Sequence, residues 1–190
     1  MKIKQVFRGV IDGPASVYWK MTRTRISPSH QDLLLFFALT LITLTPIFFF
    51  DVLPLHDLPS HMARLHVIQD RGADPLLLRY YLVDWHLVPN LALDIWAYLS
   101  TPLLDADGAS RTFIALSFLA LTSGTIFVHR ALGGAGPWPF VSFVFLWNEI
   151  LAFGFLSFLF SVGLALWLFG FWVRFRDGNI VVRVCLHAVA

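Results

Sequence analysis

Charge is scarce in this sequence, and cysteine is almost missing. Charged side chains make up 14% of the 190 residues, whereas a soluble domain normally carries about a quarter. The single cysteine, Cys185, excludes an internal disulfide framework and carries no information on the compartment. The sequence also lacks a phosphate-binding loop, an HExxH, a CxxC and a G-x-S-x-G motif, and a visible internal repeat. The enzyme classes that these motifs mark therefore have no support here.

Apolar and aromatic residues are abundant instead. Hydrophobic residues make up 57% of the chain, which includes 19 Phe and 7 Trp, and the mean hydropathy is +0.71. This composition is typical of a lipid-facing surface with aromatic side chains at the membrane interface. We therefore predict an all-α, multi-pass transmembrane helical bundle, with membrane lipid as its surroundings. We expect no nucleic-acid partner.

The few charges are segregated along the chain. Residues 1–31 hold six Lys and Arg against one acid, whereas residues 51–110 hold eight Asp against three Arg. The positive-inside rule then predicts a cytoplasmic N-terminus and an extracytoplasmic segment 51–111, in a cell membrane that we expect to be the bacterial inner membrane. The basic arm 1–32 is either a solvated flank or a segment lying on anionic lipid. It does not resemble a cleavable signal peptide, because no small-residue cleavage site follows the apolar run.

The apolar runs predict four membrane spans, the first of which contains Pro46 in its last turn. The predicted spans are 33–50, 112–132, 140–150 and 153–173. We expect the spans and their connections to form one transmembrane region, 33–175. The apolar run 176–190 resembles the start of a further span cut short, so we expect a fragment whose missing helices pack against these; the alternative is a short tail on the membrane surface.

Two segments have features beyond simple spans. Residues 87–104 carry an apolar stripe (Leu91, Ile95, Leu99) and a polar stripe (Asn90, Asp94, Tyr98), which favours an amphipathic helix lying in the interface. In the rival topology, 87–104 crosses the membrane and 140–150 is re-entrant. Separately, small residues recur at helical spacing from Gly154 through Ser157 and Ser161 to Ala165, which predicts a face for close helix packing.

The candidate site lies directly after the first span. Asp57 can cap a helix over 58–69, and helical spacing then stacks Asp57, His61 and Arg64 on one face. A carboxylate beside an imidazole and a guanidinium offers a general base, an orienting group and an anion contact. We predict Asp57 and His61 as catalytic residues and Arg64 as a substrate contact. The alternative is that Asp57 is a plain helix cap beside a solvated His61.

Other polar residues are weaker candidates. Arg79 and Asp94 could join the same surface as substrate contacts. Glu149 is a further candidate substrate contact, expected at the outer end of the third span. The alternative is that Glu149 is an ordinary interfacial acid. His56, Asp57, His61 and His66 are ligand types for zinc. The histidines are five residues apart, however, and positions at that spacing lie on different helix faces. We therefore predict no metal site, and a divalent metal cofactor is kept only as an alternative.

The order of these parts resembles the GT-C class of membrane glycosyltransferases, which use polyprenyl-phosphate sugars. The matching pieces are Asp57-Leu-Pro-Ser-His61-Met-Ala-Arg-Leu after the first span, Tyr80-Tyr81, Pro89-Asn90-Leu-Ala-Leu-Asp94, and Ala109-Ser-Arg111 at the second span. Asn148-Glu149-Ile-Leu-Ala-Phe-Gly154 is similar to a short-span pair in bacterial members of this class. The acidic pair usual in the class is missing from its place, and Asp51 competes with Asp57 for the catalytic role.

This resemblance implies a reaction and a partner. The chain would be the N-terminal portion of an enzyme that moves a sugar from a polyprenyl-phosphate donor to an extracytoplasmic acceptor. Asp57 would deprotonate the acceptor hydroxyl, and Arg64 or Arg79 would stabilise the departing lipid phosphate. The 190-residue chain alone would then be inactive. The alternative functions are a non-enzymatic membrane protein that packs with partner helices or handles lipid, and a membrane protein with a metal site.

Overall fold

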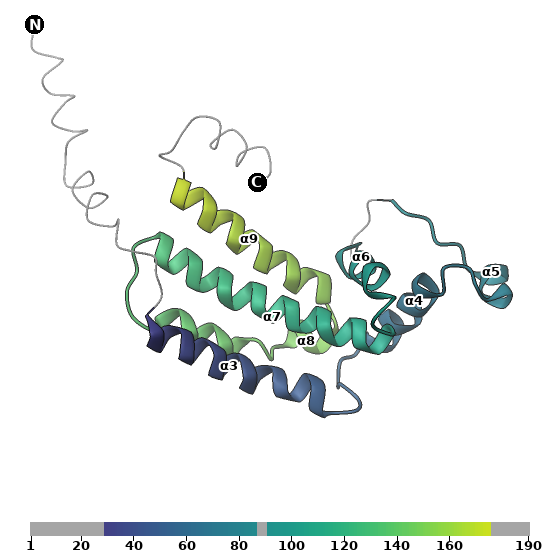
Figure 1. Ribbon diagram of the computed structural model, residues 1–190, viewed down its shortest axis with the longest axis horizontal. Helices are drawn as coiled ribbons and strands as arrows, with labels where there is room; N and C mark the ends of the chain where they lie inside the picture. The colour runs from purple at the N-terminus through teal and green to yellow at the C-terminus, as the bar shows by residue number, and fades with distance from the viewer. Residues whose placement is uncertain (1–28, 87–90, 176–190) are drawn as a thin grey trace, which may run out of the picture.

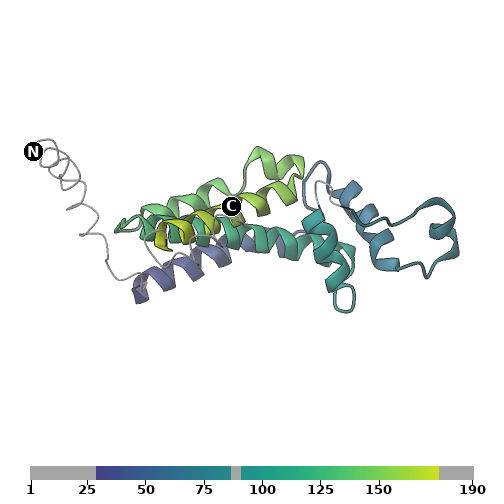
Figure 2. The ribbon, with the colours of Figure 1, turned by 90° about the horizontal axis from the view of Figure 1, so that it is seen from above.

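The computed structural model describes residues 29–86 and 91–175, and within them every regular element is a helix (Figure 1). The molecule is elongated. A bundle of long helices forms one part, and the shorter helices α4, α5 and α6 extend from one end of it, as the view from above also shows (Figure 2). The predictions made for the arm up to residue 28 and for 176–190 lie outside the described residues.

Three helices are long and apolar enough to cross a membrane: α3 (His30–Phe49), α7 (Ala106–Ala131) and α9 (Leu156–Phe175). At about 1.5 Å per residue, even 20 residues reach roughly 30 Å, the thickness of the hydrocarbon core. These helices correspond to the predicted spans 33–50, 112–132 and 153–173. The helix α7 starts earlier than predicted because Asp105 caps it, accepting a hydrogen bond from the Gly108 amide at 2.8 Å.

The predicted span 140–150 is not a helix of span length. It consists of a 3-10 helix, η1 (Trp138–Phe145), and a short α-helix, α8 (Glu149–Phe153). Contacts with α3 occur in the same order along both segments. The rings of Phe143 and Phe36 lie 5.7 Å apart, and the Trp147 indole donates to the Thr43 carbonyl at 3.2 Å. The segment from η1 to α8 therefore runs beside α3, against protein, where irregular backbone can be accommodated at membrane depth.

The helices α7 and α9 form the closest helix pair, and glycines permit it. A Cβ placed on Gly163 would lie 2.6 Å from the Cβ of Ala120, and one placed on Gly124 would lie 2.9 Å from the Cβ of Leu166. The prediction of a close-packing face from Gly154 to Ala165 is wrong in part. Ser157 is buried, but Ser161 and Ala165 are exposed, and Gly154 lies before α9.

The end of α3 is tied to the start of α7 by Arg111. Its guanidinium donates to the carbonyls of Ile47 at 2.5 Å, Phe50 at 2.7 Å and Asp51 at 2.6 Å. It also pairs with Asp107 one turn earlier, with Nε 2.6 Å from Oδ2. A cation at a helix C-terminus satisfies carbonyls that have no partner within the helix. Arg111 thus fixes where the chain leaves α3 and turns toward the candidate site.

The segment between α3 and α7 folds into α4 (Leu58–Asp70), α5 (Pro75–Tyr80) and α6 (Leu91–Ser100). The start of α4 agrees with the prediction. At ten residues α6 is about 15 Å long, too short to cross the hydrocarbon core. It packs on α4 and α7 through Leu93, Asp94 and Ala97, while Ile95 and Leu99 of the predicted apolar stripe are exposed.

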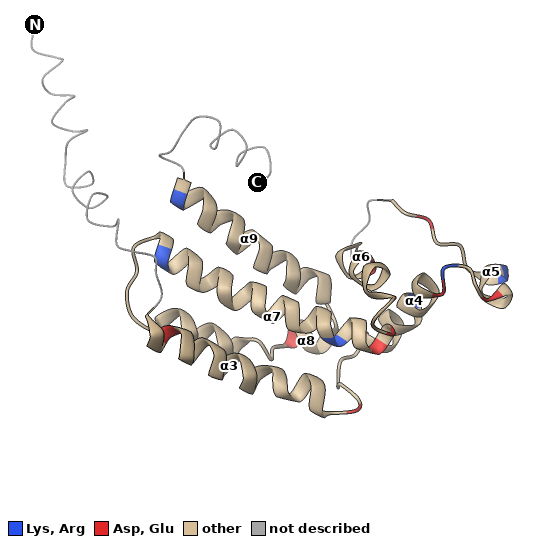
Figure 3. Ribbon diagram, in the orientation of Figure 1, with Lys and Arg blue, Asp and Glu red and all other residues tan. Residues whose placement is uncertain are grey.

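Charged residues gather at the two ends of the bundle and leave its middle without charge (Figure 3). At one end, Arg130 pairs with Asp32 at 3.1 Å, and Arg174 lies in the last turn of α9. We call this the basic end. At the other end, here called the acidic end, α3 finishes, α7 and α9 begin, and α4 and α6 lie with most of the described Asp residues.

Candidate functional site

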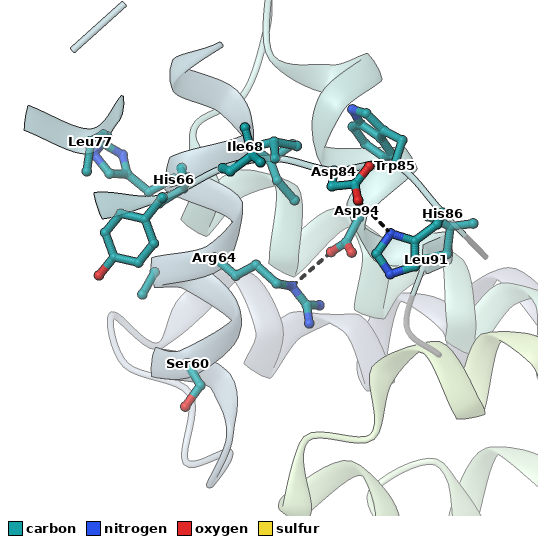
Figure 4. Close-up of a pocket in the computed structure, with 15 residues that line it drawn as sticks. Ser60, Arg64, His66, Ile68, Leu77, Asp84, Trp85, His86, Leu91 and Asp94 are labelled. Atoms are coloured by element: carbon teal, nitrogen blue, oxygen red, sulfur yellow. Dashed lines mark ion pairs between the residues drawn. The ribbon is translucent and has the colours of Figure 1, made fainter. Parts of the chain in front are cut away.

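An open cavity of about 580 Å³ lies at the acidic end, between α4, the segment 81–86 and α6 (Figure 4). Its wall is mostly apolar and includes the aromatic rings of Tyr81 and Trp85. Polar groups interrupt the wall at a few places. They are Ser60, Arg64, His66, Asp84, His86 and Asp94. An apolar cavity with a few convergent polar groups is the usual form of a small-molecule site.

Arg64 and Asp94 form the charged contact of this cavity, and they join α4 to α6. Arg64 Nε lies 3.0 Å from Asp94 Oδ1, and the Asp94 side chain is only 12% exposed. Burial raises the pKa of Asp94, and the positive charge of Arg64 opposes that rise only in part. Within the described residues, neither Arg64 Nε nor Asp94 Oδ1 has a hydrogen-bond partner. The pair is therefore held by charge without an aligned hydrogen bond, which is costly and marks a functional candidate.

Asp57 occupies the N-cap position of α4, as predicted, but its side chain does not cap the helix. The carboxylate turns instead toward His61, with Oδ2 3.5 Å from Nε2, and is 47% exposed. The alternative in which Asp57 is a plain helix cap is therefore wrong. Asp57 is outside the lining of the cavity, one helical turn before Ser60 and two turns before Arg64, both of which line it.

His61 is buried and makes contacts through both ring nitrogens. Nε2 lies 2.9 Å from the carbonyl oxygen of Gly154, and Nδ1 lies 3.4 Å from Nη2 of Arg64. A side chain with 6% exposure is not the solvated histidine of the alternative interpretation. The predicted stack of Asp57, His61 and Arg64 is thus present, and the structure adds Asp94 and Gly154 to it.

The remaining predicted residues do not line this cavity. Arg79 is exposed on α5, with its guanidinium 5.8 Å from the centre of the Tyr80 ring. Glu149 is exposed at the start of α8 and lines a separate open hollow of about 500 Å³ with Pro54 and Trp147. Both lie toward the acidic end, but neither contacts the Arg64–Asp94 pair, so the structure divides the predicted substrate contacts among different surfaces.

A metal site from His56, Asp57, His61 and His66 finds no support in the geometry. The residues 29–86 and 91–175 contain no group of three or more His, Cys, Asp or Glu side chains placed to hold a metal ion. His61 turns inward to Gly154, whereas His66 lines the cavity from the other side of α4. The helical spacing of five residues accounts for this separation.

Gly154 contacts His61 of the candidate site, whereas its spacing in the sequence predicted a place in a packing stripe. It ends α8 in the left-handed conformation, with φ at 90°, which is favourable only for glycine. A Cβ at this position would lie 2.9 Å from the Cβ of Asp57. The glycine between two apolar runs was a visible signal for a helix end, but its contact with α4 depends on the tertiary fold.

Comparison of the chain with protein-family models, with curated proteins and with solved structures gives no match. The function of the site therefore has to be inferred from its own geometry and from the resemblance noted in the sequence.

Proposed function

We propose that this chain is part of a GT-C-like membrane glycosyltransferase, in which the acidic end binds a polyprenyl-phosphate sugar and an acceptor hydroxyl. The observation that carries the proposal is the cavity at the acidic end, which has an apolar wall and the Arg64 guanidinium at its side. A lipid-linked phosphate has an apolar chain and an anionic group, and guanidinium pairs well with phosphate oxygens. Arg64 suits this role better than Arg79, which does not line the cavity.

The proposed reaction forms one bond and breaks one. The acceptor oxygen forms a bond to the anomeric carbon of the sugar while the bond from that carbon to the lipid-phosphate oxygen breaks. The acceptor proton passes to the Asp57 carboxylate, which is half-exposed and so reachable from outside the bundle. The lipid phosphate leaves with an additional negative charge, which a guanidinium stabilises. Asp94 holds Arg64 at the cavity wall.

The same proposal places the acidic end outside the cell. Arg130 and Arg174 then lie on the cytoplasmic side, as the positive-inside rule expects. The three span-length helices support a membrane location. The orientation, the bacterial inner membrane and the cytoplasmic N-terminus belong to the proposal.

A specific observation keeps one non-enzymatic function as a second candidate. Only 6% of the most apolar stretch of α3 is buried by the residues that the structure describes. Lipid can cover such a face, but so can helices of a partner or of a longer chain. A protein whose purpose is to pack with other spans would have such a face and would have no need of the Arg64–Asp94 pair.

The test is sugar transfer by the full-length protein in membranes, with radiolabelled undecaprenyl-phosphate sugars as donors. Asp57→Asn should lower transfer by about 100-fold or more, the loss typical of removing a general base. Asp51→Asn is the matched control, since Asp51 is also exposed at this end, and it should change transfer little. Near-normal transfer by Asp57→Asn would refute its role as base. Asp94→Asn should also lower transfer, because Asp94 holds Arg64 at the cavity wall.

A further inference from the structure

His61 is the best-connected side chain of the candidate site, and its contacts decide what it can do. The carbonyl oxygen of Gly154 can only accept a hydrogen bond, so the Nε2 atom 2.9 Å away must carry the proton. The other ring nitrogen, Nδ1, is then an acceptor in the neutral ring. It faces Nη2 of Arg64 at 3.4 Å, and a guanidinium can only donate. Donor and acceptor therefore match at both nitrogens.

We propose that His61 is a positioning residue, which fixes the Arg64 guanidinium at the cavity wall and links it to the turn between α8 and α9. Both nitrogens are engaged within the protein, which leaves His61 no lone pair with which to take a proton from a substrate. Arg64 is held on two sides, by His61 Nδ1 and by Asp94 Oδ1. Its remaining N–H groups are left for the cavity, which Arg64 lines.

The anchor of this arrangement, Gly154, packs closely against α4. Gly154 adopts a conformation with φ at 90°, and its Cα lies against Asp57 so closely that a Cβ would come within 2.9 Å of the Asp57 Cβ. Beside it, the His56 amide donates to the Ala152 carbonyl at 2.7 Å. The carbonyl of Gly154 is thus held in place relative to α4, and the imidazole transmits that placement to Arg64. A histidine fixed through one nitrogen commonly orients what the other nitrogen binds.

This inference deepens the proposed function, because Arg64 is the proposed phosphate contact, but its test does not use sugar transfer. The full-length protein in lipid nanodiscs is treated with phenylglyoxal, which modifies arginine, and the rate is read for each arginine by peptide mass spectrometry. His61→Gln keeps a donor for Gly154 but removes the acceptor at the Nδ1 position. We expect Arg64 to be modified several-fold faster in His61→Gln than in the wild type. His61→Asn, whose amide oxygen replaces the acceptor but whose side chain is too short to reach the Gly154 carbonyl, should restore part of the protection.

Arg71 is the matched control within the same helix region. Its guanidinium donates to the Tyr98 carbonyl at 2.7 Å and lies 4.3 Å from the centre of the Tyr98 ring, so His61 has no part in its contacts. Its rate should not change in either His61 variant. Unchanged rates at Arg64 would refute the proposal. An equal rise at Arg64 and Arg71 would also refute it, because His61 would then support the fold in general rather than Arg64.

A second variant tests the link from the bundle. Gly154→Ala should shift the carbonyl of residue 154, since its Cβ has no room beside Asp57. We expect faster modification of Arg64 here too, although residue 154 does not contact Arg64. Histidine labelled with ¹⁵N gives an independent readout, in which the His61 signal, assigned by its loss in His61→Gln, should show the Nε2–H tautomer at neutral pH. The Nδ1–H tautomer would overturn the assignment of donor and acceptor.

Discussion

Replacing Arg111 by methionine tests how the end of α3 is held. The Arg111 side chain is 11% exposed, and its guanidinium donates to three carbonyls at the end of α3. A hydrogen bond to a charged donor contributes about 1.5–3 kcal/mol where water is excluded. Two of the three carbonyls belong to exposed residues, Phe50 and Asp51, and water can replace the guanidinium there. We therefore expect Arg111→Met to lower the free energy of unfolding by about 2–4 kcal/mol, well short of three full hydrogen bonds.

The assay is equilibrium unfolding of the full-length protein in mixed micelles, with increasing amounts of a denaturing detergent. Arg111→Lys should have an intermediate effect, because one ammonium cannot reach all three carbonyls at once. Asp107→Asn is the matched control. It removes the ion pair with Arg111 but leaves the carbonyl contacts, and an ion pair that is open to solvent on its Asp107 side contributes about 0.2–1 kcal/mol. Equal losses for Asp107→Asn and Arg111→Met, or a loss under about 0.5 kcal/mol for Arg111→Met, would refute this account.

Three further predictions concern packing, topology and pH. Gly163→Leu should destabilise the pair of α7 and α9 by about 1–3 kcal/mol through overpacking, whereas Ala165→Leu, on the exposed face of α9, should stay within about 0.5 kcal/mol of the wild type in the same unfolding assay. Single cysteines are placed at Ala73, near α5, and at Ala135, at the basic end, in an otherwise cysteine-free protein. In intact cells, an impermeant thiol reagent should label the first cysteine and leave the second unlabelled. The reverse pattern would contradict the proposed topology. Burial raises the pKa of Asp94, so the folded state holds this proton more tightly than the unfolded state. The folded state therefore loses stability as the pH rises from the ordinary aspartate range through the raised pKa. The free energy of unfolding of Asp94→Asn, measured across that range, should lack this part of the decline, and an unchanged pH slope would contradict the prediction.

Much of the bundle was predictable because its signals are local. Long apolar runs identified α3, α7 and α9, and the position of Asp57 predicted the start of α4. The earlier start of α7 also had a local signal, since Asp105 is a favoured cap residue. The segment 138–153 was not predicted correctly, because apolar content alone does not distinguish a 3-10 helix beside α3 from an α-helical span.

In the candidate site, too, only the local contacts were predictable from the sequence. Helical spacing alone predicted the neighbours Asp57, His61 and Arg64, which lie within two turns of one helix. The contacts with Asp94 and Gly154 connect residues far apart in the sequence, and no local pattern specifies them. The orientation of α6 was also unpredictable for this reason. Asp94 turns inward and meets Arg64 of α4, whereas Tyr98 of the same predicted polar stripe is exposed.

The contacts of α4 and α6 with the bundle mean that the segment between α3 and α7 is not a detachable module. His61 depends on a carbonyl beyond α8, and the Trp96 indole donates to Ala109 and Thr112 of α7 at 3.2 and 3.0 Å. An excised polypeptide covering only this segment would lose those partners, and a graft onto another set of spans would have to carry the α8–α9 turn with it. We therefore expect substitutions in this turn and in α4 to be correlated among related sequences.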